Sequence, residues 1–366
     1  MTHLTWSEQL NKRVRSGAWT DQALPTLEAV QAALAGAGAE LGVSAGRLEQ
    51  AAQLIDYFME EAKVVYSVYK VWLRGFLDWL EQQGVTAADR QAELDRLATL
   101  LAYSEGAPFE PVAHWAALGE RAGRLANRVR GGDLTGASAG AELEALRESW
   151  RQLHDRYADL MSGILTFVAR RFGEDRLEEC YRYVLEPYIA ERYQPFDVRQ
   201  QPYAETLFRN VYLTFEAMRA HLCGPQRRGE IEFEELADRY VFRFDPCGSG
   251  GRTLRGDPDE GSGSRVLPPY NFGVTQAPHD WAWNEQGICY YCAHCCLALE
   301  RLPAERWGHP VRVVDPPVWG GPDAASTARK CQWTIYKQLE AIPETAYARI
   351  GLHKPPATSP PERTSP

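Results

Sequence analysis

The segment 287–296, GICYYCAHCC, concentrates the reactive side chains of this 366-residue chain, because it holds four of the eight cysteines and one histidine. Cys289, Cys292 and Cys295 are spaced as C-x2-C-x2-C. Two thiolates three residues apart in a tight turn can bind one metal ion, which is why the spacing recurs in zinc sites. The spacing therefore predicts a metal site in this segment.

Further ligands must come from other parts of the chain. Cys247, in the stretch DPCGSGGR, follows a predicted strand and is the first candidate, and Cys331 and His279 are others. We predict zinc as the cofactor, because thiolates are preferred zinc ligands. The predicted ligands are Cys247, Cys292, Cys295 and Cys289.

Two alternatives to zinc stay open. The C-x2-C-x2-C run is also the three-cysteine run of ferredoxins, which predicts an iron–sulfur cluster with a remote fourth ligand. The cysteines can also lack a metal, and they then pack as small hydrophobic residues or act as thiols.

The glycines that follow Cys247 predict a site for an anionic substrate. Backbone N–H groups of a glycine-rich turn can form an anion-binding nest, and arginine binds carboxylates with two parallel hydrogen bonds. We predict Arg252 as the orienting arginine, and His154 and His294 as the groups that move protons. The predicted substrate-binding residues are Gly248, Ser249, Gly250 and Gly251.

Composition narrows the class of protein. Hydrophobic residues make up 45% of the chain and charged residues 24%, which is typical of a globular protein. The net charge of −9 argues against a nucleic-acid partner, since binding to phosphates needs a basic surplus. Neither an apolar secretory segment nor a run of about 18 apolar residues is visible, so we expect no membrane partner and a cytoplasmic location. Clustered cysteines in that compartment indicate metal binding or catalysis rather than disulfides.

The first two thirds of the chain predict helices. Apolar residues from Ala51 to Trp79 alternate steps of four and three, which is typical of a long packed helix that ends near Gly84. A second such pattern runs from Leu143 to Phe167, and aligning Gly75 with Gly163 matches the two patterns. This match suggests an internal duplication, although any two amphipathic helices can align in this way. Shorter helices are predicted at 86–102, 111–130, 174–191 and 203–222.

The last third of the chain predicts strands and loops. Alternating apolar residues predict a strand at 239–247, and further strands are expected at 311–317 and 331–337. The fold class is therefore mainly α with a smaller α+β C-terminal region, whose few-stranded sheet carries the cysteine-rich metal site. The predicted domains are a helical domain at 1–132, a second helical unit at 141–227, the α+β metal-binding region at 228–350 and a disordered tail at 351–366.

A resemblance to known families rests on the runs FRFDPCGSGGR, YCAHC, WGHPVRVVDPP and CQWTIYK. These runs resemble bacterial proteins that pair a helical region with a cysteine-bearing C-terminal region. Their layout is also similar to the L-2-amino-thiazoline-4-carboxylate hydrolase family, although the C-x2-C-x2-C run has no counterpart there. The resemblance implies hydrolysis of a small substrate that contains a carbon–nitrogen bond.

The leading hypothesis is a zinc-thiolate enzyme that acts on a small anionic molecule by hydrolysis or a related lyase reaction. In this view the fourth zinc position is open to water or substrate. The alternatives are a structural zinc that staples a protein-interaction module and an iron–sulfur redox protein. A small-molecule substrate is the expected partner, a homodimer is a further possibility, and the N-terminal helices are open to a catalytic, a regulatory or a dimerisation role.

Overall fold

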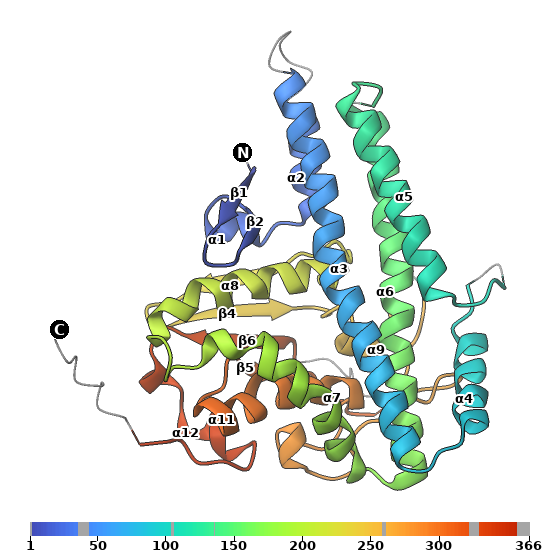
Figure 1. The fold of residues 1–366 in the computed structure, drawn as a ribbon, viewed down its shortest axis with the longest axis vertical. Coiled ribbons are helices and arrows are strands. Elements are labelled where there is room, and N and C mark those ends of the chain that lie inside the picture. The colour runs from blue at the N-terminus through green and yellow to red at the C-terminus, as the bar shows by residue number, and fades with distance from the viewer. Residues whose placement is uncertain are drawn as a thin grey trace.

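Two layers of structure make up the fold, and the long helices form the first of them (Figure 1). The structure is a computed structural model that describes residues 2–35, 44–103, 106–134, 136–257, 261–321 and 329–356. In the first layer four helices run alternately up and down as a bundle. They are α2 (Thr26–Ala35), α3 (Ser44–Gln82), α5 (Pro111–Arg130) and α6 (Gly136–Phe172), and α4 (Ala87–Leu100) packs beside α6.

The predicted periodicity of α3 is confirmed. Ile55, Phe58, Phe76 and Trp79 are all buried, so the stripe faces the core. The chain leaves α3 through Gly84, whose φ of +79° is a left-handed conformation that favours glycine. The four shorter predicted helices are confirmed within two residues at each end, and the pattern from Leu143 to Phe167 lies inside the longer α6.

Two glycines sit where other helices press against the long helices. A Cβ atom on Gly75 would lie 2.9 Å from Val184 of α7 (Arg176–Arg192), and one on Gly163 would lie 2.4 Å from Leu97 of α4. Both glycines thus permit a close helix crossing, and α3 and α6 run in the same direction (Figure 1). The internal duplication stays a prediction.

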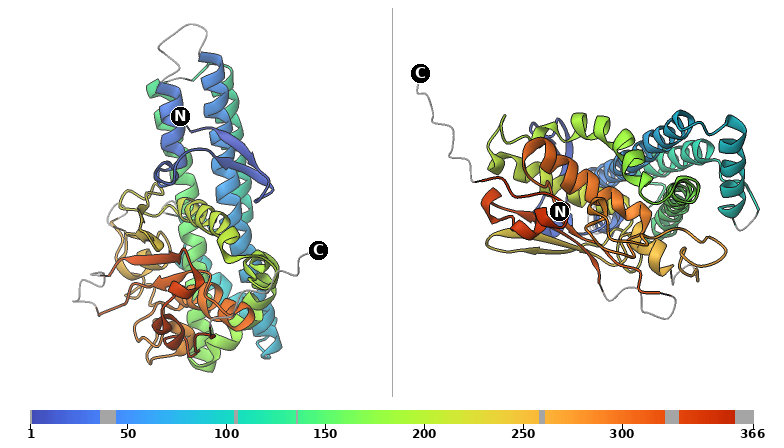
Figure 2. Two further views of the ribbon diagram at one scale, coloured as in Figure 1. Left: turned by 90° about the vertical axis from the view of Figure 1, so that its left-hand side faces the viewer. Right: turned by 90° about the horizontal axis from the view of Figure 1, so that it is seen from below.

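The second layer is a small antiparallel sheet with helices packed beside it (Figure 2). Its strand order is β3 (Glu232–Glu235), β4 (Arg239–Phe244), β6 (Cys331–Tyr336) and β5 (Val313–Asp315). The three predicted strands are confirmed as β4, β5 and β6. Helix α8 (Tyr203–Ala220) packs on the sheet, since Phe215 contacts Phe242 with ring centroids 4.9 Å apart.

Several short elements were not predicted from the sequence, because three to six residues are too few to show a period. An N-terminal hairpin, β1 (Leu4–Ser7) and β2 (Lys12–Arg15), precedes the bundle and is followed by α1 (Trp19–Gln22). The cysteine segment, for which the metal-site prediction assumed a tight turn, is helical from Tyr290 onward. The short helices of the second layer are η2 (Gln194–Phe196), α9 (Gly250–Arg255), η3 (Asp280–Ala282), η4 (Tyr290–Cys292), α10 (Ala293–Cys295), the π-helical η5 (Cys296–Arg301), α11 (Leu302–Trp307), η6 (Leu339–Ala341) and α12 (Glu344–Ala348).

One continuous hydrophobic cluster links both layers, with buried members from Leu27 to Ile350. The predicted division into domains stays a prediction, and its segments share this core. Residues 357–366 of the predicted disordered tail lie outside the described residues. Among the helices that the structure describes, none is long and apolar enough to cross a membrane.

Candidate functional site

Four cysteines and two histidines from distant parts of the chain line one small cavity. Its volume is about 40 Å³, enough for one or a few water molecules. The thiols come from the turn after β4, from the cysteine segment and from the first residue of β6. These cavity residues are Cys247, Cys292, Cys295, Cys331, His221 and His294.

Strand pairing and a glycine bring the thiols together. β6 pairs antiparallel with β4 so that Cys331 lies opposite Phe244, and Cys247 follows three residues later. The turn then passes directly over the cysteine segment, because a Cβ atom on Gly250 would lie 2.1 Å from Cys292 Sγ. The register of β4 and β6, together with the missing side chain at Gly250, thus brings the cavity thiols close to one another.

Replacing Gly250 by alanine should disturb this packing. We expect Gly250→Ala to lower the free energy of unfolding by about 1–3 kcal/mol, the usual cost of overpacking a core. Urea denaturation measures the change. Gly119→Ala on α5 is a matched control, because its Cβ meets nothing within 4 Å, and helix propensity predicts a gain of up to about 1 kcal/mol. Equal effects of the two substitutions would contradict the close packing at Gly250.

The surroundings of Cys247 favour the thiolate form of its side chain. The backbone N–H of Gly251 donates a hydrogen bond to Cys247 Sγ at 2.9 Å. The pKa of Cys247 is lowered to about 6, chiefly by a hydrogen bond from the Cys331 thiol, with burial opposing and the N–H groups of Gly251 and Ser249 assisting. At neutral pH this thiol is mostly ionised.

The neighbouring thiols stay protonated. Proximity to the Cys289 side chain and burial raise the pKa of Cys292, and burial raises that of Cys295. The pKa of Cys331 rises chiefly because its thiol is hydrogen-bonded to Cys247. Cys247 is therefore the cavity thiol that ionises first, and thiolates are the nucleophilic form of cysteine.

A chain of hydrogen bonds fixes the tautomer of His221. Asp155 Oδ1 lies 2.8 Å from His154 Nδ1, and His154 Nε2 lies 2.9 Å from His221 Nδ1. Both histidines are neutral, since burial lowers the pKa of each. A carboxylate only accepts hydrogen bonds, so His154 donates from Nδ1 and accepts from His221 Nδ1. His221, which lines the cavity, therefore has its unprotonated, basic nitrogen at Nε2.

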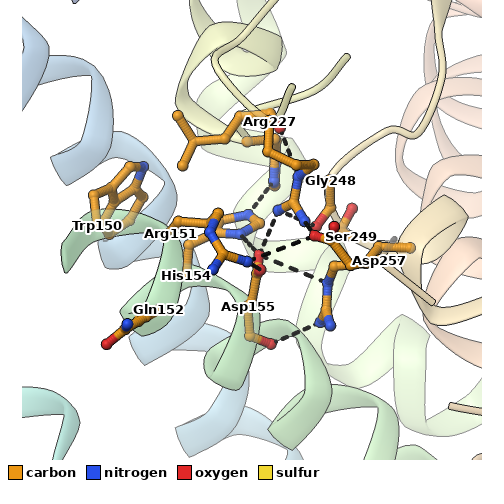
Figure 3. A network of polar contacts seen from close by, with 12 residues as sticks. Trp150, Arg151, Gln152, His154, Asp155, Arg227, Gly248, Ser249 and Asp257 are labelled. Atoms are coloured by element: carbon orange, nitrogen blue, oxygen red, sulfur yellow. Dashed lines mark hydrogen bonds and ion pairs between the residues drawn. The ribbon is translucent and has the colours of Figure 1, made fainter. Parts of the chain in front are cut away.

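Arg227 connects the hydrogen-bond chain of Asp155, His154 and His221 to the turn that carries Cys247 (Figure 3). Its guanidinium donates hydrogen bonds to Asp155 Oδ1 at 2.6 Å, to Asp257 Oδ2 at 2.5 Å and to the Gly248 carbonyl at 3.2 Å. Its Nε also donates to the carbonyl of Leu222, the residue after His221. One buried arginine thereby positions both the histidine-containing hydrogen-bond chain and the turn that carries Cys247.

The predicted histidines occupy different positions. His154 is fully buried and does not line the cavity, so it can act only through His221. His294 does line it. Its Nδ1 donates to the Tyr291 carbonyl, and its Nε2 lies 3.2 Å from Cys295 Sγ.

The predicted substrate-binding turn is only partly turned toward the cavity. Ser249 and Gly250 line the cavity, whereas the N–H of Gly251 donates its hydrogen bond to Cys247 Sγ. A Cβ atom on Gly248 would lie 1.9 Å from the His221 carbonyl oxygen, so this glycine serves a close approach. Arg252 is fully buried and bonds to Asp159 Oδ1 at 2.5 Å, and it is not among the cavity residues.

The thiols and imidazoles of the cavity are of the types that bind zinc. Within the described residues, however, no group of three or more histidine, cysteine, aspartate or glutamate side chains is arranged to hold a metal ion. Cys289 is fully buried and does not line the cavity. The zinc site and the iron–sulfur alternative therefore stay predictions without structural support.

The sequence predictions assigned no role to His221, Asp155 and Arg227. His221 follows the last residue of α8 and looked like an ordinary helix-end cation. One local indication of the hydrogen-bond chain is visible in the sequence, the adjacency of Asp155 and His154. Their hydrogen bond joins neighbouring residues and so depends on no distant segment.

Comparisons with models of protein families, with curated protein sequences and with solved structures found no match for this chain. The resemblance drawn from the cysteine and strand motifs stays a prediction.

Proposed function

We propose that this protein is a thiol-dependent hydrolase of small molecules, with Cys247 as nucleophile and His221 as acid and base. The observation that carries the proposal is the pairing of a stabilised thiolate with an imidazole of fixed tautomer around one cavity. A nucleophile beside a base that a third group orients is the general arrangement of covalent catalysis. Asp155 and His154 act through His221 and are positioning residues.

The first step transfers an acyl-type group to Cys247. The thiolate sulfur attacks the electrophilic carbon, a C–S bond forms, and the bond to the leaving nitrogen or oxygen breaks. The electron pair of that bond stays on the leaving atom, which takes up a proton that solvent supplies through His221.

The second step is hydrolysis of the thioester. His221 Nε2 accepts a proton from a water molecule whose oxygen attacks the acyl carbon. A C–O bond forms, the C–S bond breaks, and its electron pair returns to Cys247 as the thiolate. The net reaction adds one water across the scissile bond.

The activated ester p-nitrophenyl acetate tests the proposal without knowledge of the natural substrate. We expect a burst of p-nitrophenolate of about one equivalent, and acetylation of the Cys247 peptide by mass spectrometry. Cys247→Ser should lose the burst. Cys295→Ser, which removes a protonated thiol from the same cavity, is the matched control and should keep it. An acetyl group on another residue of the wild-type protein would overturn the assignment.

The positioning role of His154 gives a separate prediction. We expect His154→Phe to slow deacetylation of Cys247 roughly tenfold or more, since general base catalysis typically contributes 10²–10⁴, and to alter its pH profile. The rate of acetylation by excess reagent should change little, because the Cys247 thiolate depends on other groups. An unchanged deacetylation profile would show that His154 only fills space.

Removal of metal distinguishes this proposal from the zinc-thiolate alternative. We expect dialysis against 1,10-phenanthroline to leave the acetylation of Cys247 unchanged, because no step of the proposed mechanism uses a metal. Elemental analysis before and after dialysis verifies the treatment. Loss of acetylation together with loss of zinc would favour a zinc-thiolate enzyme instead.

A further inference from the structure

A second, larger cavity adjoins the thiol cavity. Its volume is about 90 Å³, and it shares four lining residues with the thiol cavity, so the two cavities are direct neighbours. The shared residues are His221, Tyr291, His294 and Trp333. The apolar part of its wall includes Val65 and Trp72 of α3, Tyr188 of α7 and Leu213 of α8.

Two arginines, Arg192 and Arg312, also line this second cavity. Arg312 is 4% exposed, and its Nε donates to Asn210 Oδ1 at 2.8 Å. Its guanidinium carbon lies 5.3 Å from the centre of the Trp333 ring. Arg192, at the end of α7, has its guanidinium carbon 5.6 Å from the centre of the Tyr188 ring. Tyr193 is hydrogen-bonded to both guanidinium groups.

These arginines lack the carboxylate partners that other buried arginines have. Arg219 pairs with Glu61, and Arg227 and Arg252 pair with aspartates. Across the described residues, no aspartate or glutamate lies within ion-pair distance of Arg192 or Arg312. Glu216, which favours the charged form of Arg192, is itself bound by Lys12 and Tyr57.

Two positive charges in an apolar cavity are costly unless an anion joins them. From this juxtaposition we infer that Arg192 and Arg312 form the anion subsite of the substrate, and that the ligand is a small carboxylate with an apolar body. The carboxylate meets the two guanidinium groups, which match its planar oxygens. The apolar body lies among the aromatic side chains and points its reactive carbon toward Cys247. This inference rests on the proposed hydrolase function and names its substrate class.

Butyrate and its neutral isostere butyramide probe the subsite by isothermal titration calorimetry on the full chain. We expect butyrate to bind at least about tenfold more tightly than butyramide, because each charge-assisted hydrogen bond contributes strongly in a buried site. Arg192→Met should remove that difference and leave butyramide binding unchanged. Arg74→Met, an exposed arginine on the same α3 that lines the cavity, is the charge-matched control and should behave as wild type.

Three results would overturn the inference. They are equal binding of butyrate and butyramide, a preference that survives Arg192→Met, and tighter binding of inorganic phosphate than of butyrate with the same dependence on Arg192. Arg192 is only partly buried, so its variant is expected to fold even where Arg312→Met does not. Calorimetry reads binding alone, so a failure here is separate from a failure of Cys247 acetylation.

Discussion

Iodoacetamide is expected to alkylate Cys247 at a rate that rises with pH and reaches half of its plateau near pH 6. The reason is that the thiolate is the reactive form and the pKa of Cys247 is lowered to about 6. An ordinary cysteine has a pKa near 8.5 and is only a few per cent thiolate at pH 7. Cys247 is about 90% ionised there, so its thiolate fraction is roughly thirtyfold larger. Quantitative mass spectrometry of the alkylated peptides at each pH measures the profile.

The Cys331 hydrogen bond supplies the internal control for this experiment. Cys331→Ala removes the largest contribution to the lowered pKa of Cys247, so its half-plateau pH should move upward. Cys295→Ala leaves that hydrogen bond in place and should not move it. A wild-type midpoint at or above pH 8 would contradict a preformed thiolate and remove the basis of the proposed nucleophile.

Replacement of Arg227 by methionine is expected to have the largest effect on stability. Arg227 is 1% exposed and pairs with two carboxylates that are themselves buried, Asp155 and Asp257. Removing one partner of a buried ion pair leaves uncompensated charge, which costs about 3–5 kcal/mol. The midpoint of urea denaturation at constant slope measures the loss. The exposed pair of Arg124 and Glu120 provides the control, because Arg124→Met should cost no more than about 1 kcal/mol.

The same ion pairs predict how acid unfolds the protein. Although burial opposes it, Arg227 and Arg252 hold the pKa of Asp155 well below its ordinary value. A carboxylate with a lowered folded-state pKa stabilises the fold above its unfolded pKa, about 3.9, and this contribution is lost as the pH falls through the folded pKa. Arg227→Met should therefore narrow the gap in stability between pH 7 and pH 3. If Arg227→Met does not fold, the difference in stability between pH 7 and pH 3 is measured on Arg227→Lys instead. This variant keeps the charge but not the forked geometry of the guanidinium group.

Local periodicity was sufficient to predict the helices from α3 to α8 and three of the four strands of the sheet, but not α2. The burial of one stripe on α3, and of Phe242 and Phe244 in β4, follows from where apolar side chains recur along the chain. The hairpin at the N-terminus and the helical turns of the cysteine segment could not be predicted in this way. Each is too short to show a period and is held by contacts with distant residues.

The sequence by itself also drew attention to Cys247, the cysteine segment and His294, because reactive residue types cluster there. Only the tertiary structure decided their roles. The strand register places Cys331 beside Cys247, and a buried arginine joins Asp155 to the turn at Gly248. The helix packing brings His221 to His154 across 67 positions of sequence. A hydrogen bond depends on distance and direction in space, so no spacing along the chain could have shown that His221, rather than His154, lines the cavity that holds Cys247.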